Sequence, residues 1–379
     1  MPSSISSSEP APISRSVPPG PWGRSFALSL VLFVLFVGCM EARLALRGFV
    51  PALEDSAGLW AVQRVRASRL GTQALILLGG SRIQLAADLD VLRKTTGLEP
   101  VQLAIDGSNF LPVLEDLASD PSVRGTVLVD FGDHLLLGVR PDDPAHGYIR
   151  EYRRRQAARV FALVTFTRAE QWLESLLQEQ LRSYADGARP LTSLWSRLLR
   201  DNPVPQYLLM REDRSRRADY SRVHVPELYY ARVMRNLNAN IPVTTPMTHE
   251  EMERELRRRI DEVAPMDGSL QQYLSGARYL SGVAARIRGH GGSVRFMRLP
   301  SSGLVRLLEE RRFPRTRFWD RFAQEVSAPT LHFEDVSALR AFTCPDGSHL
   351  DFHDRERFTR ALAAALGVAG KSSGAGVDR

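Results

Sequence analysis

The sequence predicts an α/β protein in which a parallel sheet is covered by helices on both faces. Short apolar runs alternate with amphipathic helical segments over residues 73–136, and the same alternation resumes over residues 293–366. A long, charged helical stretch separates these two parts, and an uncharged apolar segment lies near the N-terminus. We therefore expect a three-layer domain with a large helical insertion, preceded by a transmembrane helix.

Composition narrows the classes of function. The chain has 379 residues, of which 44% are hydrophobic, so it can build a full core. The net charge of +7 comes almost entirely from arginine, since Lys94 and Lys371 are the two lysines, but acidic residues are interspersed and no basic motif alternates with aromatics. We therefore expect no nucleic-acid partner. The two cysteines have no zinc spacing, so neither a metal nor a cofactor is expected.

The N-terminal region predicts a membrane anchor. Residues 1–23 are rich in Ser, Pro and Gly and predict a disordered tail. Residues 24–46 carry no charge between Phe26 and Met40, and basic residues precede this run. This pattern favours a signal-anchor helix with the tail on the cytoplasmic side.

Two other interpretations of this region stay open. One is a cleaved signal peptide. The other is a lipoprotein signal, in which Gly38 precedes Cys39, although Phe36 stands where leucine is usual. Because Cys39 lies in this apolar stretch, we expect no bridge between it and Cys344. All three interpretations place the bulk of the chain outside the cytoplasm, on the periplasmic or extracellular side.

The first part of the sheet domain, residues 70–140, is predicted from three strands and two helices. The strands are "QALILLGG" (73–80), "VQLAIDG" (101–107) and "GTVLVDF" (125–131). Between them, "SRIQLAADLDVLRKTTG" (81–97) and "LPVLEDLASD" (111–120) have a helical spacing of apolar residues. Strands that alternate with helices in this way pair in parallel.

Residues 141–290 predict a helical insertion. Residues 148–185 and 248–264 have helical patterns, and the charged segment "YLLMREDRSRRADYSRV" (207–223) between them is irregular. We expect the insertion to cap or flank the sheet and to offer a surface for an envelope protein partner. A separate helical domain is the alternative.

The second part of the sheet domain, residues 291–368, returns to the α/β pattern. Strands are predicted over 293–300 and 330–336, with a helix over 304–314 between them. A loop and a last helix over 354–366 follow. Residues 369–379 predict a second disordered tail.

Three residues in these parts form a candidate catalytic triad. Ser81 follows two glycines at the end of the first strand, and Asp346 and His349 lie three apart just before the last helix. Ligands bind at the carboxyl edge of parallel strands, and a final loop can return to that edge. A serine needs a base to take its proton, and an acid can orient that base, so we expect Ser81 as nucleophile, His349 as base and Asp346 as orienting acid. Asp351 is the competing acid, and we expect His353 to be a surface residue rather than a metal ligand.

The blocks "GGSR", "AIDGSN" and "PDGSHL" together resemble the SGNH/GDSL hydrolase superfamily, including its membrane-anchored D-alanyl transfer proteins. The resemblance covers residues 73–136 and 293–366. It implies a flavodoxin-like sheet, with the N–H groups of Ser81 and Gly107 in an oxyanion hole. The family's third block, Gly-x-Asn-Asp, is absent from "LVDFGDHLLL" (128–137), and we expect Asn109 to supply the amide instead.

The expected function is that of an exported, membrane-anchored serine esterase or O-acyltransferase. Its substrate would be an acylated glycan, polysaccharide or lipid of the cell envelope, and Arg82 and Arg298 are candidates to face an anionic substrate. The alternative is a catalytically inactive scaffold or binding protein of the envelope that keeps the same fold.

Overall fold

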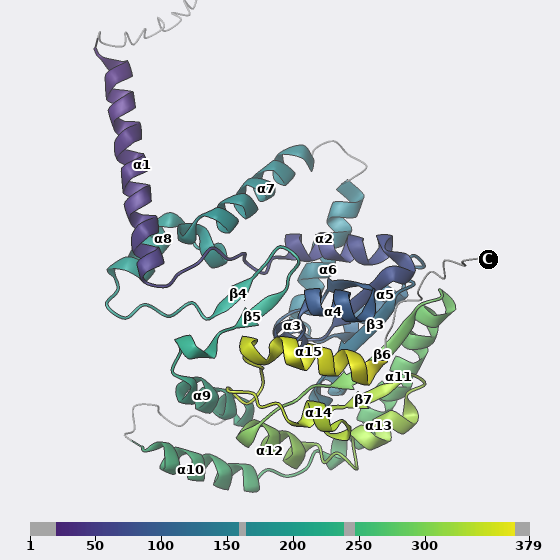
Figure 1. Ribbon diagram of the computed structural model, residues 1–379. Helices are drawn as coiled ribbons and strands as arrows, with labels where there is room; N and C mark the ends of the chain where they lie inside the picture. Colours follow the sequence, from purple (N-terminus) through teal and green to yellow (C-terminus); the bar gives the residue numbers. More distant parts are fainter. Residues whose placement is uncertain (1–19, 159–163, 239–246, 368–379) are drawn as a thin grey trace, which may run out of the picture.

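The computed structural model describes residues 20–158, 164–238 and 247–367. A parallel sheet of five strands in the order β2-β1-β3-β6-β7 lies at its centre (Figure 1). The strands are β1 (Ala74–Leu78), β2 (Glu99–Gln102), β3 (Thr126–Asp130), β6 (Ser293–Arg298) and β7 (Thr330–His332). The predicted α/β class is confirmed, and a strand lies in each of the five predicted regions. The second strand is displaced, since it was predicted over 101–107 and β2 ends at Gln102. The order turns back at β1, so the carboxyl ends of β1 and β3 lie at a topological switch point.

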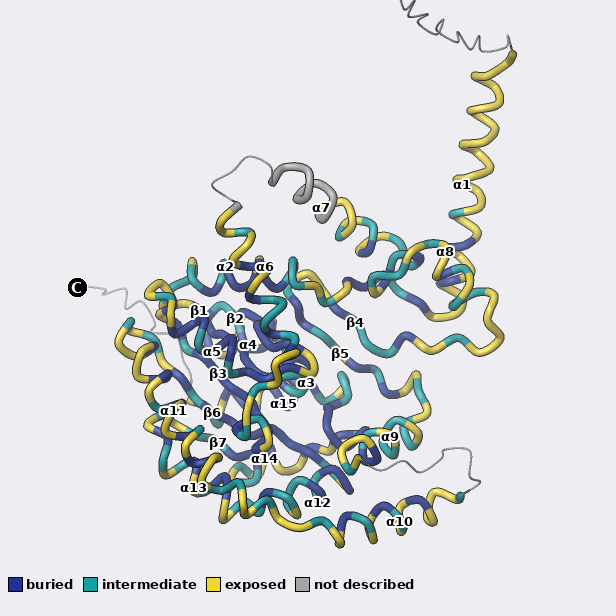
Figure 2. Tube along the Cα trace, turned by 180° about the vertical axis from the view of Figure 1, so that it is seen from behind, coloured by how far each residue is buried: buried dark blue, intermediate teal, exposed yellow. Residues whose placement is uncertain are grey.

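Helices cover both faces of the sheet, because side chains of a strand alternate between the two faces. Every residue of β1 is buried. Ile76 and Leu78 belong to a cluster on one face, and Leu75 and Leu77 belong to a second cluster on the other. The sheet is therefore the middle of three layers, and its buried strands lie between the helices in Figure 2.

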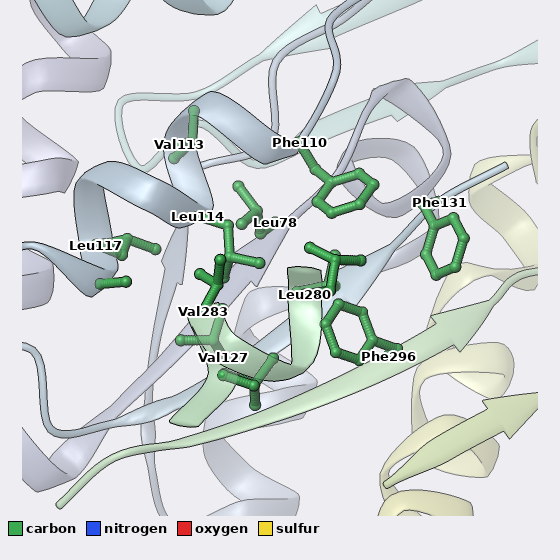
Figure 3. Packing of buried hydrophobic residues seen from close by; sticks show 14 of the residues in the cluster. Leu78, Phe110, Val113, Leu114, Leu117, Val127, Phe131, Leu280, Val283 and Phe296 are labelled. Atoms are coloured by element: carbon green, nitrogen blue, oxygen red, sulfur yellow. The ribbon is translucent and has the colours of Figure 1, made fainter. Parts of the chain in front are cut away.

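The larger cluster is built by helices from both parts of the domain. They are α2 (Ala57–Arg69), α5 (Leu111–Ala118), α6 (Pro144–Ala158), α11 (Leu270–Gly289) and α13 (Trp319–Glu325). Figure 3 shows Leu114 of α5 and Leu280 and Val283 of α11 beside Val127 and Phe296 of the sheet. The opposite face is covered by α3 (Ser81–Ala86), α4 (Leu89–Thr96), α14 (Ser337–Arg340) and α15 (Phe352–Leu366).

The single helix predicted over 81–97 is instead two helices, α3 and α4. Asp88 caps the start of α4, because its side chain accepts from the N–H of Val91. The break is held from α15, since Thr359 accepts from the N–H of Asp88 and Arg355 donates to the carbonyl of Ala87. A tertiary contact therefore ends a helix that local periodicity would continue.

The segment between β3 and β6 is less separate than the predicted insertion over 141–290. Its first and last helices, α6 and α11, pack in the core of the sheet. Between them lie α7 (Val164–Gln180), the 3-10 helix η3 (Arg182–Gly187), α8 (Pro190–Ser193), the π-helix η4 (Leu194–Leu199), α9 (Val225–Leu237) and α10 (His249–Asp261). The charged stretch predicted to be irregular contains an antiparallel hairpin, β4 (Leu208–Met210) and β5 (Arg216–Ala218). Helices α9 and α10 pack against α12 (Gly303–Arg312) in a cluster of their own.

The N-terminal helix α1 (Trp22–Leu46) projects from the rest of the structure (Figure 1). It is long and apolar enough to cross a membrane, which fits the predicted anchor over 24–46. Most of the two predicted tails, 1–23 and 369–379, lies outside the described residues, as do residues 159–163 of the helix predicted over 148–185.

Candidate active site

Ser81 lies at the carboxyl edge of the sheet because two glycines let the chain turn there. β1 ends at Leu78, and Gly79 has φ +144°, a conformation that L side chains rarely adopt. A Cβ at Gly79 would lie 2.5 Å from the carbonyl oxygen of Asp130 on β3. Glycine is therefore required where the chain passes β3, and Ser81 follows as the first residue of α3.

The structure brings together the three residues of the predicted triad. The Ser81 Oγ lies 2.8 Å from His349 Nε2, and His349 Nδ1 lies 2.9 Å from Asp346 Oδ2. These distances are those of hydrogen bonds between a nucleophile, a base and an orienting acid. Asp346 and His349 lie in the loop before α15, which returns to the edge where β1 ends.

Asp346 accepts from donors on both of its carboxylate oxygens. Its Oδ1 accepts from the backbone N–H groups of Ser348 (2.9 Å) and His349 (2.8 Å). Its Oδ2 accepts from the Tyr220 hydroxyl at 2.7 Å and pairs with Arg232 Nη2 at 2.8 Å, in addition to its bond with His349. The carboxylate is therefore fixed in orientation and kept ionised.

Tyr220 and Arg232 come from the segment between β3 and β6. Tyr220 lies in the 3-10 helix η5 (Tyr220–Arg222), and Arg232 lies in α9. Sequence reasoning missed both residues because neither stands in a motif, and Tyr220 is 126 residues from Asp346 in the chain. The segment predicted to flank the sheet thus contributes side chains to the site.

Burial and charge set the protonation states of the triad. Burial alone would raise the pKa of Asp346, but the hydrogen bond and charge of His349 and the charge of Arg232 outweigh it, so this pKa lies below its ordinary value. Burial lowers the pKa of His349 below 6.5, and Asp346 offsets this only in part. His349 is therefore neutral at pH 7 and able to accept the proton of Ser81.

Two backbone N–H groups near Ser81 are candidates to bind an oxyanion. Within the ranges that the structure describes, neither the N–H of Ser81 nor that of Gly107 donates a hydrogen bond. Gly107 has φ +67°, and a Cβ there would meet no atom within 4 Å, so this loop faces open space. The loop runs beside the end of β1, since Ile105 N–H donates to the carbonyl of Gly79.

The hydrogen bonds of Asn109 do not fit its predicted role as an oxyanion donor. Its amide nitrogen donates to the carbonyls of Leu135 (2.8 Å) and Gly138 (3.1 Å). Its side-chain oxygen accepts from the N–H of Leu111. Asn109 is buried and ties the loop after β2 to the loop after β3, so both amide hydrogens are already used.

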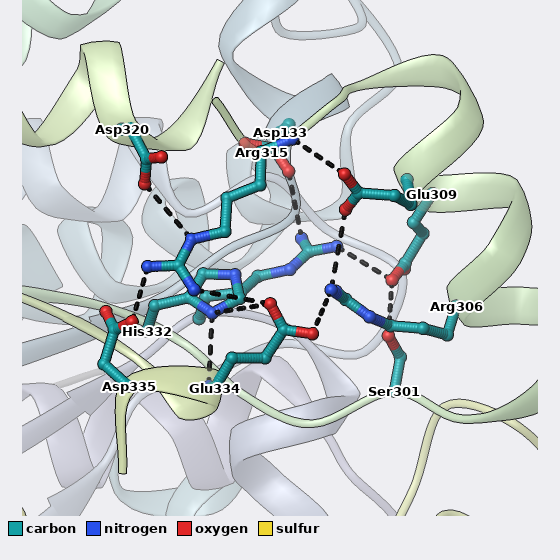
Figure 4. A network of polar contacts seen from close by, with 11 residues as sticks. Asp133, Ser301, Arg306, Glu309, Arg315, Asp320, His332, Glu334 and Asp335 are labelled. Atoms are coloured by element: carbon teal, nitrogen blue, oxygen red, sulfur yellow. Dashed lines mark hydrogen bonds and ion pairs between the residues drawn. The ribbon is translucent and has the colours of Figure 1, made fainter. Parts of the chain in front are cut away.

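Arg298 also does not fit its predicted role, because it is buried in an ion network. It is 4% exposed, pairs with Glu309 at 2.8 Å and donates to the carbonyl of Phe131. Figure 4 shows this network, in which Glu309 also accepts from Ser301. Burial would raise the pKa of Glu309, but Arg298 and Arg82 lower it to about 2. The charge of Arg298 is therefore paired inside the protein, and this guanidinium is not presented to a substrate.

Arg82 connects this network to the triad loop. Its Nη2 pairs with Glu309, and its Nε donates to the Ser348 hydroxyl at 3.2 Å. Its Nη1 is buried without a hydrogen-bond partner among the described residues. Arg82 thus braces the loop that carries His349, and its guanidinium is not free to bind a substrate through Nη2.

The loop after β3 presents a histidine where the resembled family has asparagine. In a Gly-x-Asn-Asp block the Asn stands two residues after the Gly, and in this chain Gly132 is followed by Asp133 and then His134. His134 is exposed, whereas Asp133 is buried and accepts from the Tyr273 hydroxyl at 2.7 Å. Although the residue as a whole is exposed, desolvation of the imidazole by nearby protein atoms, together with the charges of Arg298 and Arg82, lowers its pKa to about 4, so the ring is neutral at pH 7.

The other two candidates of the triad loop pair with each other. Asp351 caps α15 and pairs with the exposed His353, so it does not compete with Asp346 for His349. Both cysteines, Cys39 and Cys344, are free thiols. Among residues 20–158, 164–238 and 247–367, no group of three His, Cys, Asp or Glu side chains is arranged to hold a metal ion.

The chain was compared with protein-family models, with curated proteins and with solved structures, and no match was found in any of the three.

Proposed function

We propose that this protein is an SGNH-type serine esterase or O-acyltransferase. The observation that carries the proposal is the continuous chain of hydrogen bonds from Ser81 through His349 to Asp346 at the edge of a parallel sheet. Two features support the superfamily. The sheet has the flavodoxin-like order, with β6 and β7 as fourth and fifth strands, and the serine comes first and the Asp-x-x-His pair last.

The proposed reaction starts with attack of the Ser81 Oγ on the carbonyl carbon of an ester. His349 Nε2 takes the hydroxyl proton as the new C–O bond forms, and Asp346 stabilises the resulting imidazolium. The N–H groups of Ser81 and Gly107 would donate to the oxyanion. When the tetrahedral intermediate collapses, His349 gives its proton to the departing alcohol, and the acyl group stays on Ser81.

A second acceptor then completes the cycle. A water or a sugar hydroxyl attacks the acyl carbon, His349 removes its proton, and Ser81 leaves as the free alcohol. Water as acceptor makes the protein an esterase, and a hydroxyl of a glycan makes it a transferase. Both reactions use the same three residues. The triad therefore supports formation of an acyl-enzyme, but it does not distinguish an esterase from a transferase.

We propose His134 as the third oxyanion donor, in place of the family's asparagine. It follows β3 at the same sheet edge as Ser81, since β1 and β3 are paired and Gly79 passes beside Asp130. A neutral imidazole can donate one N–H, as an amide does. This role would remove the one clear departure from the family pattern.

The apolar helix α1 supports an envelope substrate. If α1 crosses a membrane with the basic flank on the cytoplasmic side, the sheet domain lies outside the cytoplasm. Acylated glycans, polysaccharides and lipids are the ester-bearing polymers and amphiphiles found there, so we propose one of these as substrate.

A fluorophosphonate probe tests the proposal in the full-length protein in detergent. We expect covalent labelling of the Ser81 peptide, because a serine activated by a neutral histidine attacks the phosphorus. Ser81→Ala should abolish labelling, and Ser275→Ala, which changes an exposed serine on α11, should leave it unchanged. Absence of labelling in folded wild-type protein would favour the inactive scaffold instead.

A further inference from the structure

The C-terminal end of α1, from Met40 to Leu46, packs against the folded domain, and we call it the foot of α1. Met40 and Leu44 are buried and share a small apolar cluster with Phe49, while Leu194 and Leu198 of η4 pack against it. The apolar residues nearer the N-terminus of α1 are exposed instead, including Phe33 and Phe36. The apolar side chains of α1 are therefore exposed before about Met40, whereas Met40 and Leu44 contact protein.

Polar contacts fix the same foot. The Glu41 carboxylate accepts from the backbone N–H groups of Arg182 (2.8 Å) and Ser183 (2.9 Å). Arg47 Nη1 donates to the carbonyl of Arg197 at 2.6 Å. The segment 182–200 is thus attached to the last turns of α1 at several points, and it cannot move far from the end of the helix.

The length of α1 places this attachment at the membrane surface. From Trp22 to Cys39 the helix rises about 27 Å at 1.5 Å per residue. The hydrocarbon core of a bilayer is about 30 Å thick, with a few ångströms of headgroup region on either side. If residues 22–39 cross the core, the contacts that begin at Met40 lie in the headgroup region.

Two exposed apolar faces lie beside this foot. Leu191, Trp195 and Leu199 are spaced four apart and are 80%, 75% and 60% exposed, and we call them the apolar stripe. Trp195 and Leu199 of the stripe directly follow Leu194 and Leu198, and these two leucines pack on the foot of α1. On α7, the large apolar side chains of Trp172, Leu173 and Leu176 are also exposed. Figure 1 shows α7 and α8 at the foot of α1, with α7 running obliquely on the side from which α1 projects.

We propose that the apolar stripe and the exposed face of α7 rest in the headgroup–acyl boundary of the bilayer that α1 crosses. Tryptophan is enriched at this depth, and helices with an exposed apolar face insert about 5–10 Å into it. Arg189 and Arg200 flank the stripe and are exposed, so they can meet lipid phosphates. The sheet domain would then keep one orientation to the membrane surface. This inference rests on α1 crossing the bilayer and not on catalysis at Ser81.

The test measures the depth of nitroxide labels on the full chain in phospholipid nanodiscs. Cys39→Ser removes the exposed thiol, and the remaining Cys344 is buried, which raises its pKa to about 12 and keeps it unreactive. Single cysteines are then placed by Trp195→Cys and Leu173→Cys. Leu32→Cys on α1 is the hydrocarbon control, and Glu253→Cys on the exposed face of α10 is the aqueous control.

The readout is the ratio of collisions with oxygen, which partitions into lipid, to collisions with a water-soluble nickel chelate. We expect ratios at positions 195 and 173 that lie several-fold above the position 253 value and below the position 32 value. Ratios equal to that of position 253, with position 32 still reporting hydrocarbon, would overturn the proposal. Exclusion of both oxygen and the nickel chelate at positions 195 and 173 would also overturn the proposal, because these positions would then be covered by protein rather than by lipid.

Discussion

At the scale of single residues, the triad acid distinguishes this site. Asp346 accepts from two backbone N–H groups, Tyr220 and His349 and pairs with Arg232. Arg232 brings a positive charge close to the triad, which opposes protonation of His349. Burial is the larger cause of the lowered pKa of His349, and Arg232 lowers it further, so the proposed base is weaker than an ordinary histidine.

This arrangement predicts the pH dependence of ester hydrolysis. Activity needs neutral His349, so the acid limb of kcat/KM should lie below pH 6.5, with activity lost as pH falls through the lowered pKa. Arg232→Gln removes a charge that lowers this pKa, so the acid limb of kcat/KM should move to higher pH.

Tyr220→Phe should reduce kcat about tenfold, the effect of losing about 1.4 kcal/mol from one charge-assisted hydrogen bond.

The matched control for Arg232 is Arg235→Gln, which changes an exposed arginine one turn further along α9. It should leave the pH–rate profile in place. If the acid limb of Arg232→Gln coincides with that of the wild type, or if both variants shift it equally, Arg232 does not act on His349 through its charge.

At the scale of elements, the loops after β1, β2 and β3 lie at one edge of the sheet, and we propose that all three contribute to the site. Ser81, the Gly107 loop and His134 follow these three strands in order. Local sequence predicted the first two loops, because a Gly-Gly-Ser or Asp-Gly sequence after an apolar run indicates a turn at a strand end. It did not predict the role of Asn109, whose amide is taken up by Leu135 and Gly138 from the next loop.

The third loop gives a prediction for His134. His134→Ala should reduce kcat by about 10²–10³, the effect of removing one oxyanion donor, with little change in KM. His134→Asn should restore most of that loss, since an amide can donate from a similar position. Steady-state hydrolysis of a nitrophenyl ester measures both. Equal kcat for His134→Ala and the wild type, with unchanged melting temperature, would remove His134 from the proposed oxyanion hole.

At the scale of the whole molecule, the segment between β3 and β6 has more roles than the sequence predicted. The sequence predicts that it caps or flanks the sheet, and α6 and α11 do pack on one face of the sheet, where they form part of the core. Its middle supplies Tyr220 and Arg232 to the triad and clamps the foot of α1. Such contacts join residues more than 100 positions apart, so no local pattern of apolar or charged residues can indicate them.

The α/β class, the approximate positions of the strands and the proximity of Ser81, Asp346 and His349 could be predicted because each depends on local order, although β2 lies earlier in the chain than predicted. A buried strand is a short apolar run, and Ser81, Asp346 and His349 stand next to a strand end or a helix start. The break between α3 and α4 could not be predicted, because it depends on hydrogen bonds from residues of α15 that are distant in the sequence. The same limit applies to Arg298, whose burial follows from Glu309 and Asp133 in other elements.

The central claim is that Ser81 forms an acyl-enzyme. The most direct measurement is to mix the full-length protein with nitrophenyl acetate, quench in acid within the first turnover and locate the acetyl group by peptide mass spectrometry. The account predicts one acetyl group on the Ser81 peptide in the wild type and none there in His349→Ala. An acetyl group on another residue, or none on Ser81 while nitrophenol is released at a rate that Ser81→Ala leaves unchanged, would contradict it.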